Sequence, residues 1–250
     1  MSDHVQQDQP PGVPPLTLTG ERTLPDVPEE NYWYRRHLAV YQWIAERVAG
    51  LRVVDLACGE GYGADVLART AADVVGVDAN PDAYEHARLR YRRANLRFER
   101  GLVEQFDSEC DAIVFLQTIE HVEEPGSLLE RMAASAPVAY VSTPNRLTLA
   151  PPGADKSGNP WHLREYTPGE YRALVRPLFA RVEFRGVFHA RKLRLHEVAL
   201  RLGWDRVHTA LHLTKPFYDR FVPAIAASDF ELRDDRDLDS SLDLLAVCHR

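Results

Sequence analysis

The sequence has few cysteines, and their pattern excludes the usual structural uses of that residue. Cys58, Cys110 and Cys248 are the only three in the chain. An odd number at these spacings matches no zinc site and no disulfide framework. Free cysteines are typical of a reducing compartment, so we expect a cytoplasmic protein.

The sequence also lacks long apolar runs and an excess of positive charge. No stretch approaches the ~20 apolar residues that a membrane-spanning helix needs. The first residues, MSDHVQQDQPPGVPPL, show no basic segment followed by an apolar one, so we expect no signal peptide. A formal net charge of −7 disfavours a dedicated nucleic-acid-binding protein, whose surface is usually basic. We therefore expect a soluble protein that has no membrane partner and does not favour nucleic acid as a partner. The sequence does not indicate its oligomeric state.

Within the 250 residues, composition and periodicity divide the chain into three parts. Residues 1–16 are rich in Pro, Gln and Asp, and we predict a disordered tail. Residues 17–50 are predicted to form an N-terminal helical cap, because Tyr34, Leu38 and Tyr41 recur at helical spacing. Residues 51–250 are predicted to form the main domain.

Strands and helices alternate along the main domain. We predict strands at 52–58, 73–79, 96–101, 111–118, 138–145, 181–190 and 242–250, and helices at 63–71, 81–94, 126–136 and 167–179. This order is typical of an α/β fold with a mostly parallel, seven-stranded sheet and helices on both faces. Residues 191–241 are too many for a simple turn, and we predict a helical insertion or a lid near the site.

A glycine-rich loop follows the first predicted strand, in VVDLACGEGYGADV. Gly59, Gly61 and Gly63 permit a sharp turn and a close approach of the backbone to a ligand. The glycines alone would also fit a dinucleotide site. Asp55 just before them would repel a pyrophosphate but suits a cationic ligand, and Asp78 ends the next strand where a ribose-binding acid is expected. The alternative is a purely structural turn capped by Asp55.

A second polar cluster follows the apolar strand in IVFLQTIEH. Ligands of open α/β sheets bind outside the carboxyl ends of strands, where Glu120 and His121 stand. His162 lies in a Pro- and Gly-rich loop after the neighbouring strand, from which it can return to them. A neutral histidine with a pKa of ~6.5 is a suitable base, and a bound divalent cation is an alternative way to activate a hydroxyl. Alternatively, Glu120 and His121 cap the next helix and His162 bonds only to loop backbone.

The motifs DLACGEGYG, VVGVDAN, CDAIVFLQTIEHV and VAYVSTPN, in this order, resemble those of class I S-adenosylmethionine-dependent methyltransferases from Leu51 to Arg250. The resemblance implies a Rossmann-like fold and S-adenosyl-L-methionine as cofactor. The methionine end would lie at the glycine loop, the ribose at Asp78 and the adenine beside Leu102, where many members have an Asp. The implied cofactor-binding residues are Asp55, Gly59, Gly61, Gly63, Asp78, Ala79, Leu102, Val103 and Gln117.

Some methyltransferases carry Glu-x-x-Glu-His after this strand, with a later His, and bind a divalent metal at a sugar hydroxyl pair. This chain resembles them at Glu120, His121 and His162 but has Gln117 in place of the first Glu. The resemblance implies catalytic roles for Glu120, His121 and His162. They either hold a metal ion such as Mg²⁺ or act without one, with a histidine as the base.

Three further segments resemble actinobacterial sugar O-methyltransferases of the methylglucose lipopolysaccharide type. They are LTLTGERTLPDVPEENYWYRRH, NPWHLREYT and DLDSSLDLLAV. This resemblance implies methylation of a glucose 6-hydroxyl of a cytosolic α-glucan, and Trp33 and Trp161 are candidate sugar platforms. The alternatives are O-methylation of a small secondary metabolite or of the 3′-terminal ribose of RNA, and a non-catalytic cofactor-binding scaffold.

Overall fold

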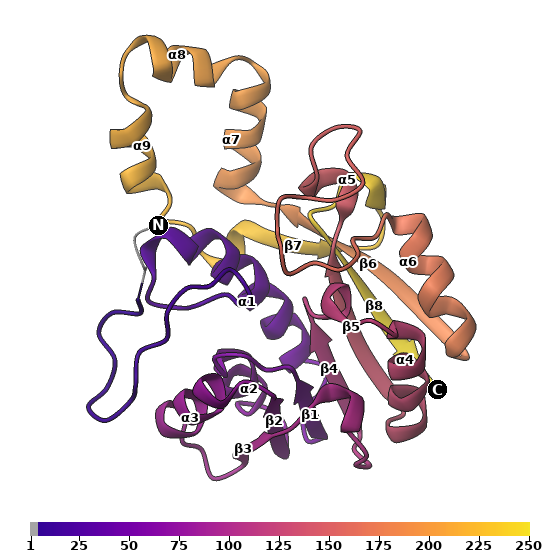
Figure 1. The fold of residues 1–250 in the computed structure, drawn as a ribbon. Coiled ribbons are helices and arrows are strands. Elements are labelled where there is room, and N and C mark those ends of the chain that lie inside the picture. Colours follow the sequence, from indigo (N-terminus) through magenta and orange to yellow (C-terminus); the bar gives the residue numbers. More distant parts are fainter. Residues whose placement is uncertain (1–4) are drawn as a thin grey trace.

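In the computed structural model, which describes residues 5–250, one eight-stranded sheet carries helices on both faces (Figure 1). The strand order is β3-β2-β1-β4-β5-β8-β6-β7. The pairs among β1 to β5 are parallel, whereas β8 runs antiparallel to β5 and β6, and β7 runs antiparallel to β6. The strands are β1 (Arg52–Leu56), β2 (Asp73–Asp78), β3 (Leu96–Arg100), β4 (Ala112–Leu116), β5 (Val138–Pro144), β6 (Arg181–His189), β7 (Phe230–Arg233) and β8 (Asp243–His249).

The sheet has one strand more than the sequence predicts. The additional strand is β7, which lies inside the predicted insertion and pairs with the end of β6, from Gly186 to His189. Its four residues alternate apolar and polar, as in a half-buried edge strand, but so short a run is indistinguishable from loop by periodicity. The helical part of the insertion therefore ends at Phe221.

The central strand β4 is buried on both faces of the sheet. All five residues of β4 are buried. Ile113 and Phe115 belong to the apolar cluster that includes α4 and α6, whereas Val114 and Leu116 belong to the cluster that includes α1 and α2. A strand covered on both faces is the reason why its sequence is continuously apolar.

Helices flank the sheet and frame its carboxyl edge. Thr167 and Glu170 form a capping box at the start of α6, with Pro168 in its first turn, which explains why the helix predicted at 167–179 begins there. The helices are α1 (Asn31–Ala45), α2 (Tyr62–Leu67), α3 (Pro81–Arg90), α4 (Pro125–Ser135), α5 (Arg146–Leu149), α6 (Pro168–Val175), α7 (Arg191–Arg201), α8 (Trp204–Ala210) and α9 (Thr214–Phe221).

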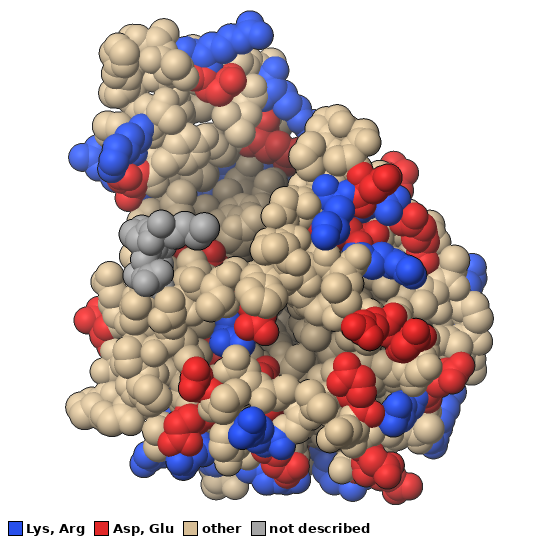
Figure 2. Space-filling view, in the orientation of Figure 1, with Lys and Arg blue, Asp and Glu red and all other residues tan. Residues whose placement is uncertain are grey.

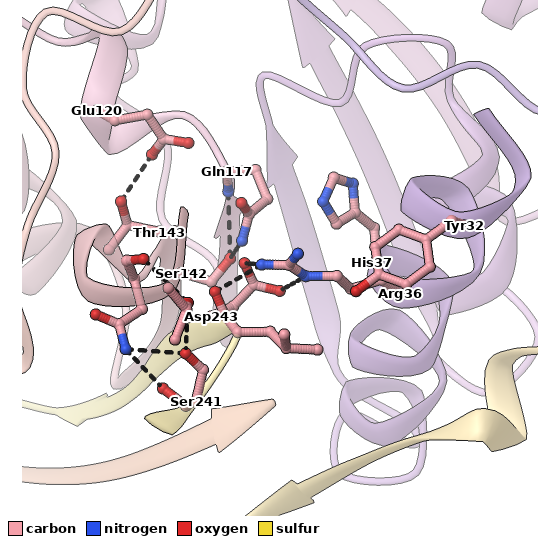
Figure 3. Close-up of polar contacts among 12 residues, drawn as sticks. Tyr32, Arg36, His37, Gln117, Glu120, Ser142, Thr143, Ser241 and Asp243 are labelled. Carbon is pink, nitrogen blue, oxygen red and sulfur yellow. Dashed lines mark hydrogen bonds and ion pairs between the residues drawn. The ribbon is translucent and has the colours of Figure 1, made fainter. Parts of the chain in front are cut away.

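A buried ion pair fixes α1 against the end of β8. Arg36 donates from Nε to Asp243 Oδ2 at 2.5 Å, and its guanidinium also donates to the carbonyl oxygen of Leu242 at 2.6 Å (Figure 3). Asp243 pairs with Pro144 at the carboxyl end of β5. Arg36 and Asp243 are both buried, so this contact holds the N-terminal helix at the edge of the sheet where the strands end.

The segment predicted as a disordered tail makes defined contacts over its described part, residues 5–16; residues 1–4 lie outside the described residues. We name residues 5–27 the N-terminal strap. Gln6 is buried, and its Nε2 donates to the Pro25 carbonyl oxygen at 3.0 Å and to Glu60 Oε1 at 3.2 Å. His86 hydrogen-bonds with Nδ1 to the Pro14 carbonyl oxygen at 2.7 Å. Composition misses this order because the strap is held by polar partners far along the chain.

Helices α7, α8 and α9 form an arch that stands away from the sheet, which we name the helical arch, residues 191–221 (Figure 1). Beyond its end, the carbonyl oxygens of Val222 and Ile225 accept hydrogen bonds from Asn31 Nδ2 at 2.8 and 3.1 Å. Among residues 5–250, no helix has the length and apolar character required to cross a bilayer.

Candidate active site

A cleft of about 770 Å³ lies at the carboxyl ends of β1, β2 and β4. This volume is within the usual range for a small-molecule site. Gly59 and Glu60 of the glycine loop line the cleft, and so do Glu120 and His121. Residues 20–23 of the N-terminal strap also line it, whereas no residue of the helical arch does so in the described chain. The segment that lies at the cleft is thus the N-terminal strap and not the helical arch of the insertion.

The three glycines of the loop have different structural roles. Gly59 and Gly61 have φ values of 57° and 97°, in the left-handed region that favours glycine. Gly59 lines the cleft. At Gly63, an added Cβ would lie 2.1 Å from the ring of Tyr41, so this glycine permits α2 to pack on α1. Gly61 and Gly63 therefore shape the loop without lining the cleft in this structure.

Asp78 is held by backbone amides at the end of β2. Its Oδ2 accepts a hydrogen bond from the Gly59 N–H at 2.8 Å, and its Oδ1 accepts one from the Asn80 N–H at 2.9 Å. Burial raises the pKa of Asp78 from its usual value. Ala79, Leu102 and Val103 line the same part of the cleft. This arrangement provides a fixed acceptor group beside apolar side chains, as a nucleoside requires.

Asp55 lies beneath the loop and does not line the cleft. Its side chain is fully buried, and Oδ1 accepts a hydrogen bond from the Tyr41 hydroxyl at 3.2 Å. Its Oδ2 has no hydrogen-bond partner among the described residues. Burial raises the pKa of Asp55 to about 8. A buried carboxylate oxygen without a partner is usually satisfied by water or by a ligand donor.

Glu120, His121 and His162 come together at the other end of the cleft. One potential ligand atom from each lies within 4.8 Å of the other two. The backbone explains the return of His162, because the Glu120 carbonyl oxygen accepts hydrogen bonds from the Leu163 and Arg164 amides at 2.9 and 3.1 Å. These bonds join the loop after β5 to the turn after β4.

The hydrogen bonds of the two histidines determine which ring nitrogen carries a proton. His121 donates from Nδ1 to the Trp161 carbonyl oxygen at 2.8 Å, and His162 donates from Nδ1 to Glu165 Oε1 at 2.6 Å. Asn159 Nδ2 lies 3.0 Å from His162 Nε2 and donates to it. Burial lowers the pKa of His121, and the bond to Trp161 offsets part of this effect. Nε2 of His121 is therefore a free acceptor within the described chain, whereas Nε2 of His162 already accepts from Asn159.

Glu120 and Gln117 have different surroundings (Figure 3). Thr143 donates to Glu120 Oε2 at 3.0 Å, and burial raises the pKa of Glu120 to about 8. Gln117 lies at the end of β4 with a φ of 53°, and its Nε2 donates to Ser142 Oγ at 3.0 Å. Gln117 lines the cleft but is not part of the Glu120, His121 and His162 group.

The ionisable residues of the cleft are mostly acidic, with Arg22 as the one Lys or Arg among its described lining residues. This imbalance favours cationic and neutral ligands over anionic ones. The acidic lining residues are Glu21, Glu30, Glu60, Asp78, Glu104 and Glu120.

Sequence reasoning missed His37, which extends from α1 on the side that faces Gln117 (Figure 3). Thr23 Oγ1 lies within hydrogen-bond distance of His37 Nδ1, at 3.1 Å, and burial lowers the pKa of His37 to about 4. Trp33, His37 and Tyr41 recur every four residues and all line the cleft, so the spacing was an available signal.

Trp33 and Trp161 are 36% and 45% exposed, so both present ring surface at the cleft.

Comparisons with known proteins agree with this arrangement. A family model described as a methyltransferase domain matches residues 32–198. A "Probable S-adenosylmethionine-dependent methyltransferase" of Mycobacterium tuberculosis is 37% identical over 267 aligned positions, which cover 99% of this chain and 96% of that protein. A similarly named protein of Mycolicibacterium smegmatis is 38% identical, with coverage of 94% and 95%. The crystal structure of a SAM-dependent methyltransferase from Thermotoga maritima has a TM-score of 0.58 at 14% identity, with coverage of 88% and 94%, which shows a shared fold.

Proposed function

This chain belongs to the S-adenosylmethionine-dependent methyltransferases, and we propose that it methylates a hydroxyl group of a neutral sugar. The proposed acceptor is the glucose 6-hydroxyl of a cytosolic α-glucan, in polysaccharide biosynthesis of the methylglucose lipopolysaccharide type. The motifs at residues 16–37, 159–167 and 237–247 support this choice.

The observation that carries the proposal is the combination of groups in one cleft. The free Nε2 acceptor of His121 and the exposed rings of Trp33 and Trp161 line one cleft, which contains a single arginine among its described lining residues. Aromatic faces and hydrogen-bonding groups suit a polyol. An RNA terminus would bring phosphates into an acidic cleft, which is electrostatically unfavourable.

The residues present fit the cofactor. When bound, S-adenosylmethionine supplies a methyl group on a cationic sulfonium centre, which suits a cleft with this acidic lining. Gly59, Asp78, Ala79, Leu102 and Val103 would hold it, with Asp78 accepting from the ribose hydroxyls. The unpartnered Oδ2 of Asp55 beneath the loop fits a donor at the methionine end, directly or through water.

The histidines would orient the acceptor and receive its proton. Nε2 of His121 accepts the proton that the acceptor hydroxyl loses, and the Trp161 carbonyl keeps the Nδ1 proton in place. Glu165 holds the ring of His162 in the same way. Because burial lowers the pKa of His121, this ring is neutral and ready to accept a proton at neutral pH.

The same three residues fit a divalent cation. Oxygen of Glu120 and Nε2 of His121 and His162 would be its ligands, and Asn159 would have to release Nε2 of His162, to which it now donates. Each imidazole has the Nδ1–H···O partner that is usual for a metal-bound histidine. A cation bound there would lower the pKa of the acceptor hydroxyl. Two imidazoles and one carboxylate suit Mn²⁺, Fe²⁺ or Zn²⁺ better than Mg²⁺, so we now propose a transition-metal ion ahead of Mg²⁺.

Calorimetry with S-adenosylhomocysteine, followed by a methyl-transfer assay on short α-glucan oligosaccharides, tests the proposal. The assay uses chelator-treated enzyme, alone and with Mg²⁺, Mn²⁺ or Zn²⁺. We expect S-adenosylhomocysteine to bind and glucan methylation to increase most with Mn²⁺ or Zn²⁺. Binding without transfer to glucan, together with transfer to a small RNA or a phenolic metabolite, would contradict the sugar acceptor. Binding without transfer to any acceptor would favour the scaffold alternative.

A further inference from the structure

The helical arch (residues 191–221) carries an unusual concentration of exposed apolar side chains. Eight of the fourteen large hydrophobic residues that are exposed in the described chain lie within its 19 residues from 195 to 213. We name them the arch patch. They are Leu195, Val198, Leu200, Leu202, Trp204, Val207, Leu211 and Leu213. Scattered single leucines on a surface are ordinary, but a cluster of this kind marks an interaction site.

The arch patch is organised by helix periodicity. Leu195, Val198 and Leu202 follow one another at spacings of three and four residues, which places them on one face of α7 and its end. Leu195 is 73% exposed and Leu202 is 84% exposed, so this face does not pack on the protein body. A hollow separates the arch from the body in the space-filling view (Figure 2).

An apolar cavity of about 420 Å³ lies beside the patch, between α8 and α9. Trp204, Phe217 and Phe221 line it, together with His208, which is 2% exposed. Neither ring nitrogen of His208 has a hydrogen-bond partner among the described residues. The exposed Arg220 also lines this cavity. A hydrocarbon chain with an anionic head fits such walls.

The charge of the arch is opposite to that of the whole chain. Residues 191–221 contain seven Lys or Arg and three Asp or Glu, whereas the chain has a net charge of −7. The body is therefore strongly acidic. No ion pair is formed by Arg191, Arg194, Arg206 or Arg220 within the described residues. Lys and Arg side chains lie at the crown and along the outer side of the arch (Figure 2).

The geometry of the arch separates its basic groups from the acidic body. Helix α7 has 11 residues and leaves the sheet at the end of β6. Such a helix is roughly 16 Å long, about twice the Debye length of ~8 Å at physiological ionic strength. The crown can therefore approach an anionic surface while the repulsion from the body is screened.

We propose that the helical arch docks this enzyme on an anionic membrane surface, which revises the expectation from the sequence that it has no membrane partner. Leucines of the patch would enter the interface between headgroups and acyl chains, and the unpaired arginines would meet the lipid phosphates. A second copy is a poorer partner. An isologous contact would place two positively charged arches together, and a heterologous contact of arch on body would propagate into an open chain. The proposal concerns the arch alone and does not depend on the identity of the acceptor.

Flotation with lipid vesicles tests the proposal. Full-length protein is mixed with vesicles of phosphatidylcholine alone or of phosphatidylcholine with phosphatidylglycerol, at low and high salt. We expect binding to the anionic vesicles only, and weaker binding at high salt. Leu195→Asp with Leu202→Asp should lower vesicle binding by about tenfold or more, because apolar burial in the interface is lost.

Matched variants separate the arch from general effects of charge and folding. Leu147→Asp changes an exposed leucine outside the arch and should leave vesicle binding unchanged. Arg194→Glu with Arg206→Glu should abolish binding, whereas Arg131→Glu with Arg176→Glu, which alters the net charge equally on the body, should not. S-adenosylhomocysteine binding by each variant shows that it is folded.

Two results would overturn the proposal. One is equal binding of wild type and the Leu195→Asp, Leu202→Asp variant to anionic vesicles. The other is the absence of vesicle binding by folded wild-type protein. If light scattering then showed a wild-type dimer that Leu195→Asp with Leu202→Asp dissociates, the patch would be an interface between copies of this chain.

Discussion

At the residue scale, the chemistry of the cleft depends on two imidazoles held through Nδ1. We expect His121→Ala and His162→Ala each to lower kcat by roughly 10²–10⁴-fold, the range for loss of a general base. The affinity for S-adenosylhomocysteine should stay nearly constant, because neither ring lies at the glycine loop. Steady-state kinetics and calorimetry measure the two quantities. His212→Ala, which removes an exposed histidine of the arch, is the control and should keep the wild-type rate.

Retention of wild-type kcat by both site variants would show that neither histidine activates the acceptor. A parallel loss of cofactor affinity would show instead that the substitutions disturb the cleft as a whole. If the histidines act by binding a metal, added Mn²⁺ or Zn²⁺ should not restore the rate of either alanine variant, since a ligand is missing.

The raised pKa of Asp55 leads us to expect an unusual pH dependence of the free energy of unfolding. Burial raises its pKa from 3.8 to about 8, so between these pH values the folded protein keeps a proton that the unfolded chain releases. The contribution of Asp55 to the free energy of unfolding therefore falls as the pH rises from about 4 to about 8. Glu120, whose pKa is raised to about 8, contributes with the same sign.

Asp55→Asn should reduce this decline, because an amide has no proton to lose. Urea unfolding of the cofactor-free protein at a series of pH values measures the effect. Asp111→Asn is the control. Hydrogen bonds from Arg52 lower the pKa of Asp111, so its contribution is lost only as the pH falls through that lowered value. An equal pH slope for wild type and Asp55→Asn would contradict the raised pKa.

At the element scale, the contact of α1 with α2 positions the glycine loop. Gly63→Ala would place a Cβ 2.1 Å from the Tyr41 ring, so we expect it to destabilise the fold by about 1–3 kcal/mol. Gly126→Ala in α4 meets nothing within 4 Å and should be neutral or stabilise by about 0.4–1 kcal/mol. Thermal or urea unfolding compares the two variants.

If Gly63→Ala left the free energy of unfolding unchanged, α1 would be able to shift away from α2 at little cost. In that case Tyr41 would also lose its hydrogen bond to Asp55, and the pH dependence of stability would change together with it. The pair of measurements thus distinguishes local crowding at Gly63 from movement of the whole helix.

At the scale of the whole molecule, the N-terminal strap contacts the part of the cleft in which we propose that the cofactor binds. Gln6 hydrogen-bonds to Glu60 in the glycine loop, and residues 20–23 line the cleft. Deletion of residues 1–16 should therefore weaken S-adenosylhomocysteine binding by about tenfold, equivalent to ~1.4 kcal/mol. Gln6→Ala should weaken it less, and Gln7→Ala, at an exposed position next to it, should have no effect. Unchanged affinity of the deletion variant would show that the strap does not support the site.

Much of the fold followed from local patterns. The strands β1, β2 and β4, the glycine turn and the helix that follows Thr167 were predicted because their signals lie within a few residues. The Rossmann-like methyltransferase class followed from the order of these motifs. The contacts of the strap were not predicted, because its partners are distant in the sequence. His37 was missed although its spacing of four residues from Trp33 and Tyr41 is a local signal.

The sequence by itself determined the alternation of strands and helices, the glycine turn and the placing of Glu120 and His121 at a strand end. Each of these depends on residues close together in the chain. Only the tertiary structure decided that β7 completes the sheet, that Tyr41 covers Asp55, and that the strap rather than the insertion lines the cleft. Such contacts depend on the packing of distant segments, and no local periodicity encodes their partners.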